Sequence, residues 1–218
     1  SAQGSIVSQI CPVGHYCPGN TSTPEQCPAG ADGSAQGLNS STCKGACPKG
    51  HNCPVGSPAP ILCEDGTFGN GTGLEDQNNC TACPPGFWCA SGAIFECGGA
   101  SVYCPGNCSK PKQVGTGNYS WTDPALNKRL DPKNQSTHTS QARCQAGTYC
   151  IAGKVENCTL GHYCPPNSTT PLQCSAGYVG NGTSFNSSHC GGLCPKGHYC
   201  PLGSVAPVLC EDGSFGNG

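Results

Sequence analysis

The sequence predicts a small disulfide-rich repeat fold, an extended tandem array with short β-ribbons and turns, little helix and no large hydrophobic core. Three observations lead to this expectation. Leu, Ile, Val and Phe together number only 29 of 218 residues, fewer than a globular core needs. The chain has 22 cysteines, a density typical of secreted scaffolds held together by disulfides. The cysteine pattern also repeats along the chain, which is the signature of a repeat architecture.

The longest repeat has a period of 147 residues. Residues 11–71 and 158–218 align without a gap and are identical at 39 of 61 positions. Because the second copy is still in progress at Gly218, we expect more repeats beyond it. Seven cysteines define the repeated pattern, namely Cys11, Cys17, Cys27, Cys43, Cys47, Cys53 and Cys63.

A shorter step of 36 residues separates Cys11, Cys47 and Cys83 and divides the long period into modules. The expected boundaries are a lead-in at 1–10, module 1 at 11–46, module 2 at 47–82, a short module 3 at 83–108, a cysteine-free basic insertion at 109–143, a partial module at 144–157, and a second period with module 1 at 158–193 and module 2 at 194–218.

Most modules open with the motif C-x-x-G-x-x-C, which occurs six times, starting at Cys11, Cys47, Cys83, Cys144, Cys158 and Cys194. A glycine at the central position supplies a turn that a side chain would hinder. Pro and Gly interrupt most other stretches, so only short two-stranded ribbons and turns are expected between the cysteines.

Four cysteines in one module permit three disulfide pairings. We expect the first to pair with the third and the second with the fourth, an interlocked arrangement that contributes about 3 kcal/mol for each closed loop. The expected bonds are Cys11–Cys27, Cys17–Cys43, Cys47–Cys63, Cys53–Cys80, Cys83–Cys97, Cys89–Cys104, Cys158–Cys174, Cys164–Cys190 and Cys194–Cys210.

One long period, residues 11–157, contains an odd number of cysteines, 15. A continuing array therefore leaves one cysteine of each period without a partner inside that period. Cys104, Cys108, Cys144 and Cys150 are the least securely placed. We expect one of these four to bridge to an adjacent period or to another chain.

The insertion at 109–143 combines basic residues with a tryptophan. Thr122 or Asp123 is expected to cap a single helical turn, with Pro124 in its first position and Pro132 just beyond its end. One interpretation is an ordinary solvated loop. The other is an assembly contact with a neighbouring copy or chain, because Trp and Arg are favoured in interfaces; it involves Trp121, Lys128 and Arg129.

N-glycosylation sequons are frequent, since eleven of the fifteen asparagines are followed by x-Ser/Thr. They indicate a secreted glycoprotein. Eight are expected to carry glycans, at Asn20, Asn39, Asn70, Asn118, Asn134, Asn167, Asn181 and Asn186. Three others have cysteine in the middle position and are weaker candidates, at Asn79, Asn107 and Asn157.

Other chemistry has little support in the sequence. Four histidines occupy the same slot of the C-x-x-G-H motif, at His15, His51, His162 and His198, which favours a repeated turn contact over catalysis or metal binding. A zinc site at the cysteine pairs of 80–83 and 104–108 is disfavoured beside sequons of the secretory pathway. No enzyme motif, cofactor site or metal site is expected. A formal charge of −2 argues against nucleic-acid binding, and no apolar run is long enough to span a bilayer.

The spacing resembles that of ephrin-receptor-like cysteine-rich repeats, whose units read roughly C-P-x-G-x-Y-C-P-x-G-S followed by P-x-x-C. Residues 194–210, CPKGHYCPLGSVAPVLC, follow that unit almost throughout, and the similarity extends over 11–97 and 144–218. Arrays of this kind occur in large surface proteins of protists and algae, including proteins similar to those of flagellar mastigonemes, which polymerise into external hairs. The insertion at 109–143 departs from the repeat.

The resemblance and the composition together lead to one functional expectation. The chain is expected to be a structural subunit of an extracellular, glycosylated filament or cell-surface coat, whose partners are other copies of itself and its glycans. The alternative is the ectodomain stalk of a receptor or adhesin that binds a protein or glycan ligand. Neither is an enzyme, and fold similarity by itself does not distinguish them.

Overall fold

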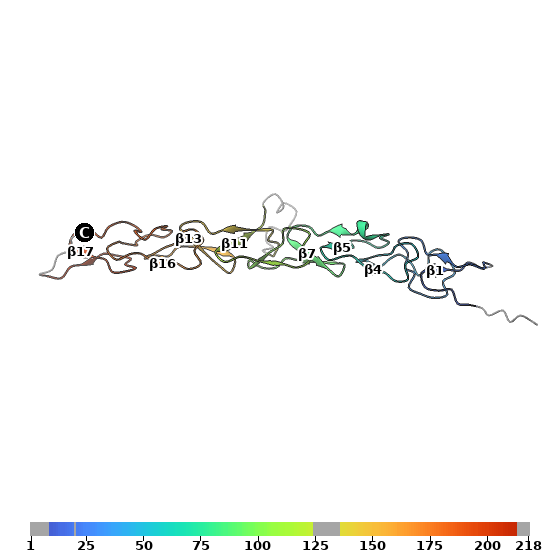
Figure 1. Ribbon diagram of the computed structural model, residues 1–218. Helices are drawn as coiled ribbons and strands as arrows, with labels where there is room; N and C mark the ends of the chain where they lie inside the picture. The colour runs from blue at the N-terminus through green and yellow to red at the C-terminus, as the bar shows by residue number, and fades with distance from the viewer. Residues whose placement is uncertain (1–8, 20, 124–135, 213–218) are drawn as a thin grey trace, which may run out of the picture. The chain divides into compact units, whose positions relative to one another are not determined.

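The computed structural model describes residues 9–19, 21–123 and 136–212 (Figure 1). Within these residues, 18 short strands form nine two-stranded antiparallel sheets. This is the small disulfide-rich repeat fold that the sequence predicts. Contacts divide the chain into two compact units, the first made of Ser1–Glu96 with Pro105–Lys110 and the second of Cys97–Cys104 with Pro111–Gly218. The expected module boundaries are finer than this division and stay predictions.

The strands of the first unit pair in sequence order. β1 (His15–Tyr16) pairs with β2 (Glu25–Gln26), β3 (His51–Asn52) with β4 (Ile61–Leu62), β5 (Thr67–Phe68) with β6 (Thr81–Ala82), and β7 (Phe87–Ala90) with β8 (Ala93–Glu96). A 3₁₀ helix, η1 (Gln77–Asn79), precedes β6, and the Asp76 side chain caps it by accepting from the Asn78 N–H.

The second unit has the same kind of pairing. β9 (Val102–Tyr103) pairs with β10 (Lys112–Gln113), β11 (Asn118–Trp121) with β12 (Ser140–Arg143), β13 (Thr148–Ile151) with β14 (Lys154–Asn157), β15 (His162–Tyr163) with β16 (Leu172–Gln173), and β17 (His198–Tyr199) with β18 (Val208–Leu209). The expected helical turn at Thr122–Pro132 has its centre in 124–135, outside the described residues.

The six C-x-x-G-x-x-C segments share one backbone turn. In each, the residue after the glycine donates its N–H to the carbonyl of the residue after the first cysteine, at 3.1–3.3 Å. The glycine has φ between 73° and 84° in all six. Such a glycine in the third position is typical of a type II turn, where a side chain would be strained. The motif therefore reverses the chain direction between its two cysteines.

The short loops of two hairpins explain their longer strands. β7 and β8 are joined by Ser91 and Gly92, and β13 and β14 by Ala152 and Gly153; all four residues have positive φ. Two such residues in succession form the turn whose twist matches that of antiparallel strands. These strands have four residues each, whereas most of the other strands have two.

The interior is made of cysteine. Among the described residues, every buried apolar side chain belongs to a cysteine except those of Ala31 and Val179. Large apolar residues such as Ile61 and Leu209 are instead exposed, at 51% and 69%. Disulfides therefore take the place of a hydrophobic core, as the low content of large apolar residues predicts.

The pairing of the ten disulfides differs from the expected one. Each C-x-x-G-x-x-C segment is closed by a bond between its own two cysteines, Cys11–Cys17, Cys47–Cys53, Cys83–Cys89, Cys144–Cys150, Cys158–Cys164 and Cys194–Cys200. We call each of these segments a cysteine hairpin. The other four bonds are Cys27–Cys43, Cys63–Cys80, Cys97–Cys104 and Cys174–Cys190.

The interlocked pairing was therefore wrong in all nine expected bonds, Cys11–Cys27, Cys17–Cys43, Cys47–Cys63, Cys53–Cys80, Cys83–Cys97, Cys89–Cys104, Cys158–Cys174, Cys164–Cys190 and Cys194–Cys210. The reason is the turn inside the motif. It brings the two Cα atoms of each cysteine hairpin to 5.7–5.9 Å, within the range of a disulfide. The third cysteine lies opposite the glycine instead, since the Cys27 N–H donates to the Gly14 carbonyl at 2.9 Å.

Backbone hydrogen bonds connect each cysteine hairpin to its neighbours in the sequence. The carbonyl of its first cysteine, or of the cysteine that follows the hairpin, accepts from a residue with positive φ at 2.7–3.0 Å. The donors are Gly37, Gly56, Gly73, Asn107, Asn167, Ser184 and Gly203, and the acceptors are Cys11, Cys27, Cys47, Cys83, Cys144, Cys158 and Cys174. We call this repeated set of bonds the backbone ladder.

The cysteine-free insertion contains a further copy of the hairpin. Val114 and Ser120 stand where Cys144 and Cys150 stand 30 residues later. Between them, Gly117 has φ 73° and the Asn118 N–H donates to the Gly115 carbonyl at 3.1 Å, as in the cysteine hairpins. Ser120 is buried, and its hydroxyl donates to the Ala100 carbonyl. The turn thus persists without its disulfide.

Candidate glycan-bearing surface

The sequon asparagines fall into groups with different surroundings. Asn20 and Asn134 lie outside the described residues. The other nine are described, and their side chains differ in exposure, backbone conformation and hydrogen bonding. A glycan is bulky and needs an asparagine at the surface, so these differences rank the sites.

The three sequons with a central cysteine are poorly placed for a glycan. The central residues Cys80, Cys108 and Cys158 are all buried. The Asn79 side chain is also engaged, because its carboxamide oxygen accepts from the N–H groups of Glu75 and Asp76 at 3.3 and 3.1 Å. This contact belongs to the cap of η1, which gives Asn79 a structural role.

The fold also explains why asparagine stands at position 118. Its carboxamide nitrogen lies 3.3 Å from the Gln141 side-chain oxygen, and the Ser120 that completes its sequon is buried. This Ser stands at the position of the second cysteine in a cysteine hairpin. The sequon therefore coincides with the hairpin copy at 114–120 and is a weaker glycan site than its sequence indicates.

Two asparagines donate hydrogen bonds of the backbone ladder. Asn107 and Asn167 have φ of 49° and 64°, and their N–H groups donate to the carbonyls of Cys83 and Cys144. Asparagine adopts this left-handed conformation more readily than other residues with a side chain. The backbone geometry thus accounts for asparagine at both positions, although both residues are exposed.

Asn39, Asn70, Asn181 and Asn186 are exposed, and the backbone ladder does not use them. Asn39 and Asn186 are equivalent positions of the two long periods. Asn70 and Asn181 share the tetrapeptide Gly-Asn-Gly-Thr but lie in different units. These four are the best placed of the described sequons to carry glycans.

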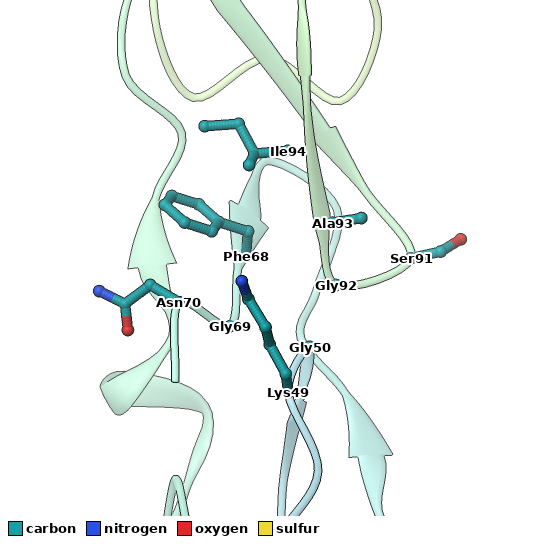
Figure 2. A pocket seen from close by; sticks show the side chains of 9 residues that line it. All are labelled: Lys49, Gly50, Phe68, Gly69, Asn70, Ser91, Gly92, Ala93 and Ile94. Carbon is teal, nitrogen blue, oxygen red and sulfur yellow. The ribbon is translucent and has the colours of Figure 1, made fainter. Parts of the chain in front are cut away.

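A groove of about 420 Å³ lies beside Asn70 in the first unit. Figure 2 shows the side chains of Lys49, Phe68 and Ile94 around it, with those of Asn70 and Ser91 pointing outward on opposite sides. Phe68 ends β5 and Ile94 belongs to β8, so the hairpins that carry these strands both contribute to its apolar wall. The groove therefore combines an apolar wall with a cationic side chain and a sequon.

The histidines of the repeated slot contact their own turns, as the sequence predicts. His15, His51, His162 and His198 each place Nδ1 2.8–3.1 Å from the carbonyl oxygen of the residue two positions earlier. Each histidine thereby contacts the turn of its own motif in the same way. The repeated slot reflects this shared local geometry.

Among the described residues, two cysteines are free, Cys108 and Cys210. Cys104, Cys144 and Cys150, which we considered for a bond to an adjacent period or chain, are all in intrachain disulfides. Cys108 is 5% exposed, so the remaining candidate for such a bond lies inside the first unit. Cys210 is partly exposed and corresponds to Cys63, whose partner is Cys80.

The expected assembly contact is described only in part. Trp121 belongs to β11 and is 37% exposed, and its carbonyl accepts from the Thr139 N–H at 2.9 Å. Lys128 and Arg129 lie outside the described residues. The contact with a neighbouring copy therefore stays a prediction.

A single ion pair joins described residues, between Lys44 and Asp32 at 3.4 Å. Burial alone raises the pKa of Asp32. Hydrogen bonds from Ser34 and Lys44 and the charge of Lys44 outweigh this effect, so the pKa of Asp32 lies below its ordinary value of 3.8. The corresponding residues of the second period are Val179 and Gly191, which cannot form the pair.

The ten disulfides are typical of proteins that are secreted or face the outside of the cell. In the part of the chain that the structure describes, no helix is long and apolar enough to cross a membrane. No protein-family model matches this chain, and no curated protein matches it either.

Proposed function

We propose that this chain is a structural segment of an extracellular, N-glycosylated filament or cell-surface coat, built from disulfide-closed repeats that associate with other copies, and that it has no catalytic role. The backbone ladder is the observation that carries this proposal. It joins each cysteine hairpin to the segments next to it in the sequence, with bonds of the same kind in both units. An architecture of this type grows by adding repeats, because each repeat contacts only its neighbours.

Three features support an extracellular structural role. The interior consists of disulfides, which persist in oxidising compartments. Four exposed sequons, at Asn39, Asn70, Asn181 and Asn186, offer glycan sites on both units. Many large apolar side chains are exposed, among them Leu193 at 65% and Leu209 at 69%, and such side chains are available for contacts between copies. The resemblance to repeats of surface-filament proteins is in agreement with this role.

A second candidate is the stalk of a receptor or adhesin. It is favoured by the completeness of the intrachain disulfides, because within the described residues only Cys108 and Cys210 are free and Cys108 is buried. A chain closed in this way needs no covalent partner. The groove beside Asn70 also offers a place for a small ligand.

Negative-stain electron microscopy of the native, non-reduced protein tests the two candidates. A filament subunit is expected to form regular fibres whose length increases with protein concentration. Separate particles whose size is independent of concentration would contradict self-assembly and favour the stalk. Repeating the experiment in reductant tests whether assembly requires the folded modules, since reductant opens the disulfides of every module.

A further inference from the structure

The groove beside Asn70 has two chemically different sides. Phe68 and Ile94 form an apolar wall, and Ile94 is 38% exposed. Opposite them, Lys49 presents an ammonium group that has no ion pair within the described residues. A sugar ring has the same division, with apolar C–H faces and polar hydroxyl and acetamide groups at its edge. Aromatic faces attract partly positive hydrogen atoms, so the groove suits such a ring.

The floor of the groove is glycine backbone. Gly50, Gly69 and Gly92 line it, and a Cβ atom on Gly69 would lie 2.7 Å from the Cα atom of Gly50. The Gly69 N–H donates to the Gly92 carbonyl at 3.1 Å, which satisfies these backbone groups internally. The hollow is therefore a stable feature of the packed hairpins, and its volume of about 420 Å³ lies in the lower part of the range for small-ligand clefts.

The position of Asn70 indicates that an attached sugar occupies the groove. Asn70 lies at the edge of the groove with its side chain directed outward, it is exposed, and Gly71 and Thr72 complete its sequon. A Cβ atom on Gly71 would have nothing within 4 Å, so the backbone after Asn70 is open to solvent. A sugar attached to the Asn70 carboxamide starts at the edge of the groove, where its effective concentration far exceeds that of any free sugar.

Asn181 has the same tetrapeptide but different surroundings. Val179 takes the place of Phe68 and is only 8% exposed. The Phe185 ring packs close by, since a Cβ atom on Gly182 would lie 3.1 Å from its Cζ atom. The residue two positions before the asparagine is thus a half-buried phenylalanine at Asn70 and a buried valine at Asn181, which makes Asn181 the comparison site.

We infer that the N-glycan on Asn70 folds back onto the protein, with its first N-acetylglucosamine ring in the groove against Phe68 and Ile94. The inference rests on the glycosylation in the proposed function and adds a role for one glycan. This glycan covers the exposed Ile94 and the half-buried Phe68 and holds β5 against β8, whereas the glycan on Asn181 extends into solvent.

Release of the glycans by a peptide N-glycosidase under native, non-reducing conditions tests this inference. The 218-residue chain is secreted from a eukaryotic host, and glycopeptide mass spectrometry follows the loss of glycan at each asparagine. The Asn70 glycan is expected to be released about tenfold more slowly than the Asn181 glycan, because a seated sugar is protected. Phe68→Ala and Ile94→Ser are expected to abolish this difference by accelerating release at Asn70 only.

Val55→Ser is the control variant, because Val55 is exposed in the same unit and does not line the groove. Equal release rates at Asn70 and Asn181 in the unmodified sequence, or an Asn70 without glycan, overturn the inference. The Cys63–Cys80 bond, checked in each variant, shows whether the hairpin still folds. Failure of filament formation in microscopy contradicts the proposed function and leaves the release rates unaffected, so the two results are distinguishable.

Discussion

A Cβ atom on Gly180 would lie 2.6 Å from the Cα atom of Gly161, closer than such atoms approach in proteins. The Gly161 N–H also donates to the Gly180 carbonyl at 2.8 Å. The first unit has the same contact between Gly14 and Gly33, where the distance would be 2.8 Å. Backbone packs directly on backbone at these points, so the absence of a side chain is a packing requirement.

Gly180→Ala is therefore expected to destabilise the second unit. The added methyl group meets backbone atoms and the Cys174 sulfur, which cannot move freely, and overpacking of this kind costs about 1–3 kcal/mol. Thermal unfolding of the non-reduced protein measures the effect. Gly99→Ala is the control, because a Cβ atom there meets nothing within 4 Å; equal melting temperatures for the two variants would contradict the prediction.

The hairpin copy at 114–120 is expected to accept the missing disulfide. In a Val114→Cys, Ser120→Cys variant the two thiols are expected to bond to each other, because the turn between them matches that of the cysteine hairpins. Closing a loop of this length contributes about 2 kcal/mol. Peptide mapping without reduction identifies the bond. Ser120→Cys alone serves as the control, and a double variant with two free thiols would show that the copy differs in geometry.

The two free thiols are expected to react differently with iodoacetamide. Cys210 is partly exposed and is alkylated in the native protein, whereas Cys108 is buried and reacts only after denaturant is added. Mass spectrometry after alkylation without reduction measures both. Rapid labelling of Cys108 in the native protein would mean that the segment Pro105–Lys110 opens readily. A Cys108→Ala variant is expected to keep all the disulfides of its unit, since no bond uses Cys108.

The ion pair between Asp32 and Lys44 is expected to stabilise the first unit at neutral pH. Because the folded pKa of Asp32 lies below 3.8, its contribution is complete above the unfolded pKa and is lost as the pH falls through the folded value. Asp32→Asn therefore lowers stability at pH 7, by about 1 kcal/mol or less since Lys44 is largely exposed. The difference from the unmodified sequence shrinks below about pH 4.

Thermal unfolding of the two proteins between pH 2.5 and pH 7 gives this difference directly. An Asp32→Val, Lys44→Gly variant is the control, because it installs the residues of the second period. That variant is expected to show the same pH-dependent difference from the unmodified sequence as Asp32→Asn, while it keeps the backbone bond between the two positions. A difference that grows as the pH falls would show that Asp32 does not act through its charge.

Composition and periodicity predict the class of fold, because a chain this poor in large apolar residues has no material for a core other than cysteine. The four histidine contacts also follow from the repeated slot alone. The disulfide pairing could not be deduced in this way, since cysteine spacing permits several pairings and stability estimates favour the longer loops. Local geometry decided it, because Gly14 and its five equivalents turn the chain within the motif.

Which sequons are well placed for a glycan was harder to predict, for a related reason. A sequon is defined by three residues, but its environment comes from residues far away in the sequence. The Asn79 side chain completes the capping box of η1, Asn107 and Asn167 supply left-handed backbone, and Asn118 belongs to a hairpin copy. The similarity of Val114–Ser120 to the cysteine hairpins is visible in the sequence, because Gly117 and Tyr119 lie 30 residues before Gly147 and Tyr149. A search for cysteines alone passes over it.

The sequential pairing of the disulfides has a consequence for biosynthesis. Each bond joins a cysteine to the next one along the chain, over at most 17 residues. No cysteine therefore depends on a partner that is distant in the sequence. As the polypeptide emerges from its amino end, every pair is complete soon after its second cysteine appears. This pairing allows oxidation to follow the order of translation, and it allows copies to be gained or lost in evolution without a change in the bonds of the others.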